Sequence, residues 1–145
     1  FVLLSLSVFA EPKSWMKQAK PDSLGLFVSV SPKCPFTDKE LVNRFEGEFL
    51  RARLKPTNIL DFNLTVNIRC VSVKTKGGSF MGNVVSYEIM YASIMANGAN
   101  ILYETPNYGA MIVGDNKASS KQYFINTITD SVALSLTDYL KVNFQ

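Results

Sequence analysis

Strict alternation of apolar and polar residues from Leu60 to Cys70 is the feature that most constrains how this chain folds. Successive side chains of a strand point to opposite faces of a sheet, so the pattern predicts a strand with one buried face and one wet face. Such a strand needs neighbours beside it and a cover over its apolar face only. The apolar set is Leu60, Phe62, Leu64, Val66, Ile68 and Cys70.

A pair of glycines, Gly77-Gly78, follows this strand and predicts a turn into the next one. With these glycines as the turn, apolar residues of one strand meet apolar residues of the other. The expected pairs are Ile68 with Tyr87, Val66 with Ile89 and Leu64 with Tyr91. Because two independent patterns agree on one register, we expect an antiparallel hairpin with a shared buried face.

Asn97-Gly98 predicts a second hairpin directly afterwards. A strict two-residue loop would place Leu102 and Glu104 on the buried face. A three-residue loop with a bulge would place Ile101 and Tyr103 there instead. We favour the bulged loop, because its buried pair packs better.

Capping residues and apolar periodicity predict two helices. Thr37 and Glu40 form a capping box, in which each side chain satisfies a backbone amide of the first turn. Pro56 stops this helix. The stretch from Ser119 to Gln122 is a second candidate capping box, ahead of an apolar stripe on a C-terminal helix. That stripe contains Phe124, Ile128, Val132, Leu136 and Leu140, with Ile125 and Tyr139 beside it.

The predicted element order is β-α-β-β-β-α. A strand from Leu24 to Ser31 precedes the first helix, so it lies parallel to the alternating strand through a right-handed crossover. Only one face of the alternating strand is apolar, so both helices cover that side. The fold class is therefore α/β, here an α+β two-layer sandwich, with a mixed four-stranded sheet and two helices on one face. Pro106 and Gly109 place the last strand at the sheet edge.

This element order resembles that of small periplasmic domains of envelope-assembly proteins, such as the amino-terminal domain of TolB and the curli-secretion lipoprotein. The resemblance covers Leu24 to Phe144 in topology only, and it gives no residue a role. The lipoprotein members carry an anchor cysteine after their leader, whereas no cysteine follows the apolar start of this sequence. The resemblance implies a role in the cell envelope.

The N-terminal residues 1–10 form an apolar run of signal-peptide length, too short to span a bilayer. The run ends in Val8-Phe9-Ala10, which suits a signal peptidase. We therefore expect residues 1–10 to be a signal-peptide remnant, residues 11–23 a polar tether and residues 24–145 a single α/β domain. The mature protein would begin at Glu11 and be periplasmic or extracellular. The alternative is that residues 1–10 form a first buried strand or helix.

The two cysteines, Cys34 and Cys70, are expected at the same end of two neighbouring parallel strands, so their sulfurs can meet. In an exported protein an oxidised pair is the default. We predict a structural disulfide. Two alternatives remain: two free thiols, with Cys70 as a buried apolar residue, or a catalytic or redox pair.

Composition narrows the chemistry that the chain can perform. The sequence has no histidine, which removes the commonest general base and metal ligand. We expect no catalytic residues, no metal site and no cofactor. The net charge of +3 is scattered along the chain, unlike the dense stripe of a nucleic-acid binder.

Four tyrosines gather in and around the predicted second hairpin: Tyr87, Tyr91, Tyr103 and Tyr108. Tyrosine is enriched at protein interfaces, so they form a candidate partner surface. Packing in the core, with hydroxyls reaching the rim, is the alternative.

The sequence favours a non-catalytic exported accessory or binding domain, periplasmic or secreted, with cell-envelope assembly as its expected setting. Its expected partner is another envelope or secreted protein rather than nucleic acid, and the mature chain has no transmembrane segment. The alternative is a secreted hydrolase that uses carboxylates such as Glu88 and Glu104. A pocket holding both carboxylates would favour the hydrolase.

Overall fold

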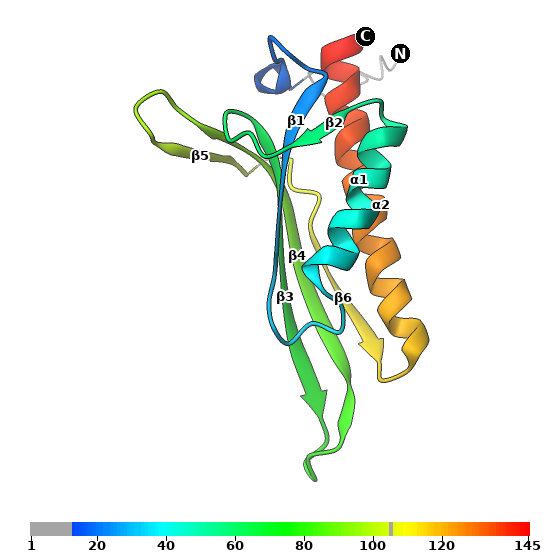
Figure 1. Ribbon diagram of the computed structural model, residues 1–145. Helices are drawn as coiled ribbons and strands as arrows, with labels where there is room; N and C mark the ends of the chain where they lie inside the picture. The colour runs from blue at the N-terminus through cyan, green and yellow to red at the C-terminus, as the bar shows by residue number, and fades with distance from the viewer. Residues whose placement is uncertain (1–12, 105) are drawn as a thin grey trace, which may run out of the picture.

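The structure is a computed structural model that describes residues 13–104 and 106–145. A single 3-10 turn, η1, precedes six strands and two helices (Figure 1). In chain order the elements are η1 Ser14–Met16, β1 Ser23–Val30, α1 Asp38–Arg51, β2 Lys55–Thr57, β3 Asn63–Lys74, β4 Phe80–Ile94, β5 Asn100–Tyr103, β6 Ala110–Asp115 and α2 Ala118–Phe144. The predicted signal-peptide remnant lies outside the described residues.

The strands form one mixed sheet in the order β2-β1-β3-β4-β5, and β6 also pairs with β4. β1 is parallel to both β2 and β3, as the crossover through α1 requires, and the other pairs are antiparallel. The prediction of a four-stranded sheet was wrong, since the sheet has six strands. β2 is a three-residue strand that pairs only with the start of β1, and the predicted last strand is divided into β5 and β6.

The β3–β4 hairpin has the predicted register. Leu64 pairs with Tyr91, Val66 with Ile89 and Ile68 with Tyr87. Near the turn the register shifts by one residue, because Val73 pairs with Gly82 whereas Lys74 pairs with Phe80. Met81 is therefore a bulge residue, and the hairpin tip twists without disturbing the buried pairs.

The β4–β5 hairpin confirms the bulged loop. Tyr91 pairs with Tyr103 and Ser93 with Ile101, which puts both predicted residues on the covered face. Gly98 has a φ of 82°, a conformation that glycine adopts without strain. The Asn97 side chain stabilises the turn by accepting a hydrogen bond from the Ala99 amide at 3.0 Å.

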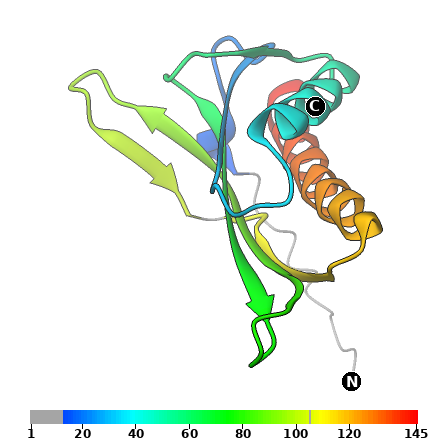
Figure 2. The same ribbon diagram turned by 60° about the horizontal axis from the view of Figure 1, so that its bottom comes forward.

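Both helices cover one face of the sheet and pack on each other, giving the predicted two layers (Figure 2). The apolar stripe of α1 is buried through Leu41, Phe45 and Phe49. The stripe predicted for α2 is also buried against the sheet, apart from a partly buried Leu140. The core thus lies between one sheet face and two helices, and the opposite sheet face meets solvent except at the side chains of Asn63 and Met90, which are buried.

The first capping box is present. The Thr37 hydroxyl accepts from the Glu40 amide at 3.2 Å, and a Glu40 carboxylate oxygen accepts from the Thr37 amide at 2.9 Å. The second predicted capping box was wrong, because Ser119 lies inside α2 and its N-cap is Lys117. This N-cap makes no side-chain hydrogen bond to the helix. Asp115, just before it, accepts hydrogen bonds from the Lys117 amide and the Ser120 hydroxyl.

Two further predictions differ from the structure. Leu60 does not share the buried face of β3, since it precedes the strand and is 47% exposed. The described part of the predicted tether packs on the domain, with Met16 fully buried. Asn143 of α2 accepts a hydrogen bond from the Gln18 amide at 2.8 Å and donates one to the Met16 carbonyl at 2.9 Å. Aromatic and hydrogen-bonding contacts therefore fix a segment whose composition is polar.

Candidate functional site

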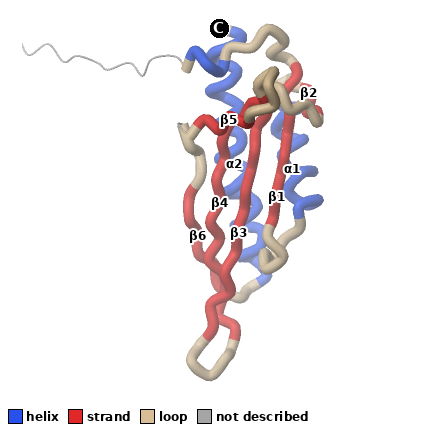
Figure 3. The backbone as a smooth tube through the Cα atoms, turned by 90° about the vertical axis from the view of Figure 1, so that its left-hand side faces the viewer, coloured by secondary structure: helices blue, strands red, loops and turns tan. Residues whose placement is uncertain are grey.

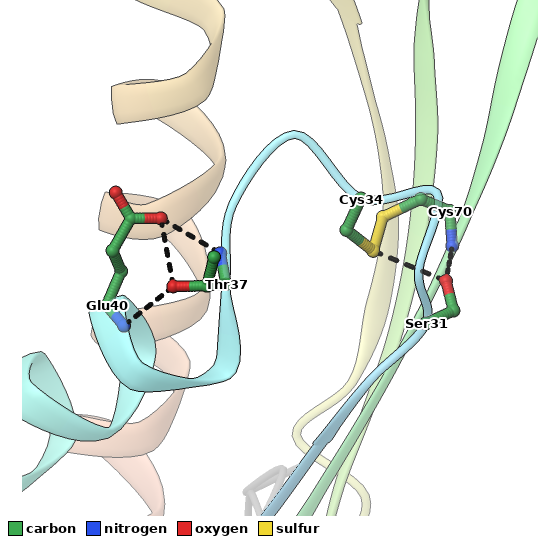
Figure 4. Close-up of a disulfide and its surroundings, with 5 residues drawn as sticks. All are labelled: Ser31, Cys34, Thr37, Glu40 and Cys70. Atoms are coloured by element: carbon green, nitrogen blue, oxygen red, sulfur yellow. Dashed lines mark hydrogen bonds between the residues drawn. A yellow bond between two sulfur atoms is a disulfide. The ribbon is translucent and has the colours of Figure 1, made fainter.

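The disulfide joins the loop after β1 to the second half of β3 (Figure 4). The Cys34 and Cys70 sulfurs are 2.04 Å apart, and their Cα atoms are separated by 5.0 Å, so the predicted pair is confirmed. The Ser31 hydroxyl lies beside the bond, accepting from the Cys70 amide at 3.0 Å and lying 3.4 Å from the Cys34 sulfur. The bond ties the loop to β3 just beyond the last β1–β3 backbone pair, Val30 with Ile68.

Two of the four predicted surface tyrosines are core residues. Tyr87 and Tyr91 project from β4 toward α2 and are buried. The Tyr87 hydroxyl is 2.9 Å from the Ser131 hydroxyl, and the Tyr91 hydroxyl donates to the Ser135 carbonyl at 2.8 Å. These hydroxyls join β4 to successive turns of α2, so neither side chain reaches a partner in this conformation.

Tyr103 and Tyr108 are only partly buried and keep accessible area. Tyr103 stacks face to face on Trp15, with ring centroids 4.3 Å apart. Tyr108 donates a hydrogen bond to the Asp138 carboxylate at 2.8 Å, and the Lys13 ammonium lies 5.6 Å from the centre of its ring. Only these two of the four predicted residues remain candidates for a partner surface.

Burial raises the pKa of three tyrosine hydroxyls above the ordinary value, at which a phenol is already protonated near neutral pH. It raises the pKa of Tyr91 well above its usual value, and it raises the pKa of Tyr139 to about 12. Burial, followed by the hydrogen bond to Asp138, also raises the pKa of Tyr108. These phenols therefore serve as neutral hydrogen-bond donors rather than as proton-transfer groups near neutral pH.

We call the end of the sheet where the aromatic rings gather the aromatic end. Its rings are Trp15, Phe62, Tyr91, Tyr103 and Tyr139, with neighbouring centroids 4.3 to 6.4 Å apart. The tyrosines were predictable from the sequence, but the part played by Trp15 was not. Its position in a stretch rich in lysine, glutamine and proline concealed it, although a lone tryptophan beside a methionine was an available signal.

The two glutamates proposed for a hydrolase do not line a common hollow on the solvent-facing side of the sheet. Glu88 is exposed and borders a hollow of about 50 Å³ that is otherwise lined by Asn67, Arg69 and Ser86. Glu104 is also exposed, and it does not line that hollow. The hollow offers one carboxylate, whereas glycosidase chemistry needs two at a working separation.

Exposed apolar side chains lie on the same solvent-facing side, toward the β3–β4 turn. We call Val71, Val73, Met111 and Val113, together with the partly buried Val84 that lies between Val71 and Val113, the hairpin-end patch. This patch was not predicted from the sequence. The available signal was that valine occupies positions 71 and 73, where the alternation of β3 calls for polar residues.

Within residues 13–104 and 106–145, no cluster of three or more acidic or cysteine side chains is arranged to hold a metal ion. Nor does any helix of that part of the chain have the length and hydropathy needed to cross a bilayer.

Comparisons with known proteins give a likeness of fold only. No protein-family profile matches the sequence, and no curated protein matches it. A solved PelC dodecamer from Paraburkholderia phytofirmans is 11% identical with a TM-score of 0.48, over 89% of this chain and 92% of that one.

Two solved lipoproteins are also similar. The minor lipoprotein from Acinetobacter baumannii is 11% identical with a TM-score of 0.35, over 78% of this chain and 88% of that one. The rare lipoprotein B from Shewanella oneidensis is 12% identical with a TM-score of 0.34, over 81% of this chain and 91% of that one. Likeness at these identities and TM-scores assigns this chain neither a family nor a function.

Proposed function

We propose that this protein is an exported, non-catalytic accessory domain that binds another envelope or secreted macromolecule outside the cytoplasm. The Cys34–Cys70 disulfide is the observation that carries the proposal. Thiols are kept reduced in most cytosols, so a structural disulfide of ordinary geometry suits an oxidising compartment. The apolar run at residues 1–10 supports the same location.

The proposed partner surface lies at the aromatic end, around Tyr103 and Tyr108. Tyr103 stands on the short strand β5, whose outer edge has no strand beside it among the described residues. An open edge accepts a partner's strand by backbone pairing. Stacking on Trp15 fixes the Tyr103 ring, which reduces the entropy lost on contact with a partner.

Export is tested by the mass of the chain recovered from the periplasm or the medium. We expect a mature chain that begins at Glu11, and no free thiol when the protein is unfolded without reductant. Retention of residues 1–10, a cytoplasmic location or two reactive thiols would contradict export.

Binding is tested by capture of envelope proteins with the purified chain, followed by dissociation constants for the captured partner. Tyr103→Ala and Tyr108→Ala should weaken binding by at least about tenfold, or about 1.4 kcal/mol, while the domain stays folded. Tyr123→Ala is the matched control, because Tyr123 is an exposed tyrosine on α2. Equal loss in all three variants, or capture of nothing by the wild type, would refute this surface.

A further inference from the structure

The strand β6 leaves one edge of the sheet open. It pairs with β4 from Gly82 to Tyr87, and its other side faces solvent with no described strand next to it (Figure 3). Every second backbone amide and carbonyl of such an edge points outward and is available for pairing. This edge therefore offers a row of regularly spaced hydrogen-bonding groups, and only another extended backbone has donors and acceptors at the same spacing.

Large apolar side chains accompany this open edge. Met111 and Val113 project from β6 on the solvent-facing side and are 69% and 66% exposed. Val113 pairs across to Val84, and Val84 pairs in turn with Val71, which is 63% exposed. The hairpin-end patch is thus a row across three strands that ends at the open edge, and a partner strand there would extend it.

Protective features common on edge strands are missing from β6 until its last residue, the exposed Asp115. Soluble proteins guard open edges with lysine, proline or inward-pointing charge. No charged residue occurs between Glu104 and Asp115, and β6 itself contains no proline. β1 also has an open backbone edge where it extends beyond β2. That edge differs from the β6 edge, because most side chains there, such as Phe27 and Val28, are partly buried.

We propose that a second copy of this chain pairs antiparallel along β6, so that two sheets join into one across a two-fold axis. A two-fold axis perpendicular to the sheet keeps the covered faces of both copies on the same side of the joined sheet. Each residue of β6 therefore pairs with a residue of the other copy whose side chain lies on the same face. With the axis at Ile112, Met111 lies opposite Val113 of the second copy on the solvent-facing side. The two apolar patches become continuous across the new pair.

Charge makes this arrangement suitable for a second copy. With the axis at Ile112, Asp115 lies opposite Gly109 of the other copy rather than opposite its own counterpart. The two Asp115 carboxylates then stand six residues apart along the strands, about 20 Å at ~3.4 Å per residue, beyond the Debye length of about 8 Å. The uncharged stretch between them pairs with itself, apolar residue against apolar residue.

A lipid surface fits the same edge less well. Apolar side chains beside open backbone groups would have to enter a medium that offers those groups no hydrogen bonds. A strand satisfies the backbone and the side chains at once. The inference is independent of the partner surface at Tyr103 and Tyr108, so either can fail alone.

The mass of the purified chain in solution, measured by sedimentation, tests the proposal. We expect a dimer of the wild type, and at least a tenfold higher dissociation constant for Val113→Lys and for Met111→Lys. Leu50→Lys is the matched control, because Leu50 is 69% exposed on α1, away from the sheet edge. Circular dichroism confirms that each variant is folded, and a monomeric wild type or equal weakening by Leu50→Lys would overturn the proposal.

The register is tested by engineered cysteines and diamide oxidation. Directly opposed residues have Cα atoms about 5 Å apart, within reach of a disulfide, whereas residues offset by two positions stand about 8 Å apart. A mixture of Met111→Cys and Val113→Cys chains should therefore crosslink faster than either variant alone. Equal rates in all three samples would contradict the axis at Ile112. Binding to anionic phospholipid vesicles by a chain that stays monomeric would point to a lipid partner and refute the dimer.

Discussion

The two ends of the sheet are closed in different ways. At the aromatic end, rings from the N-terminal segment, β4, β5 and α2 meet around Phe62, and the neighbouring Met16 of the N-terminal segment is fully buried. At the hairpin end, the Cys34–Cys70 bond fastens β3 to the loop after β1, and most of the hairpin-end patch stays exposed. One end thus depends on packing and the other on a covalent bond.

The two ends differ because large side chains converge and bury one another at the aromatic end, whereas the hairpin end has little to pack against. Segments far apart in the chain converge at the aromatic end, so large rings exclude water from one another. The β3–β4 hairpin instead extends beyond the helices, and its last residues have a cover on neither face (Figure 3). The disulfide lies where that cover ends, because Cys70 is still buried in the core whereas the residues of β3 beyond it are exposed or partly buried.

The largest expected effect is at the aromatic end, from Phe62→Asp. Phe62 is buried and stacks on Tyr91 with centroids 5.3 Å apart. A carboxylate there would have no partner, so we expect a loss of more than about 4 kcal/mol and an unfolded chain by near-ultraviolet circular dichroism. Phe62→Leu is the control and should fold. A folded Phe62→Asp chain would break the claim that packing closes this end.

Replacing Cys34 and Cys70 together by serine should cost about 3–4 kcal/mol, by the loop-closure estimate for a sequence separation of 36. The fold should persist, because the core does not depend on this bond. In this variant, hydrogen exchange should speed up most at the backbone amides of positions 31 and 70, while the fluorescence of Trp15 stays unchanged. Loss of protection spread evenly over both ends would show that the disulfide is not specific to the hairpin end.

Trp15→Ala should have a smaller effect, a loss of about 2 kcal/mol in urea unfolding. Trp15 is only partly buried, and its main contact is the stack on Tyr103. Trp15→Phe preserves a ring and should recover more than half of the loss. A neutral alanine variant would mean that the N-terminal segment adds nothing to the aromatic end.

The smallest effect is expected from Val71→Thr at the hairpin end, within about 0.5 kcal/mol, because the side chain is already in water. Val66→Thr is its counterpart on the same strand. Val66 is fully buried, so placing a hydroxyl there should cost at least about 2 kcal/mol. Similar losses in both variants, measured by urea unfolding at low protein concentration, would show that Val71 is covered.

Local signals that carry their own geometry were predictable from the sequence. The alternation of β3, the glycine turn and the capping box at Thr37 each specify backbone conformation over a few residues, and each is present. The disulfide followed from strand order, because a parallel pair brings Cys34 and Cys70 to the same end. The bulged hairpin followed from the preference for burying Tyr103.

Features set by distant contacts were not predictable. β2 is three residues including Pro56, and only its pairing with the start of β1 makes it a strand. β6 follows Gly109 and contains Gly114, so it lacks an uninterrupted strand pattern. The prediction of the candidate site was only partly right for the same reason. No local pattern indicates that α2 covers Tyr87 and Tyr91 and leaves Tyr103 and Tyr108 accessible.

The contacts of Asn143 also impose an order in time. Its side chain bonds to Met16 and Gln18 across sequence separations of 127 and 125 residues. A ribosome adds about 5–20 residues per second, so roughly 6–25 s pass between synthesis of the two partners. Throughout that interval residues 13–18 have no helix on which to dock. Any factor that binds residues 13–18 during synthesis therefore finds them not yet packed on the domain. These residues dock on α2 only after α2 has been synthesised.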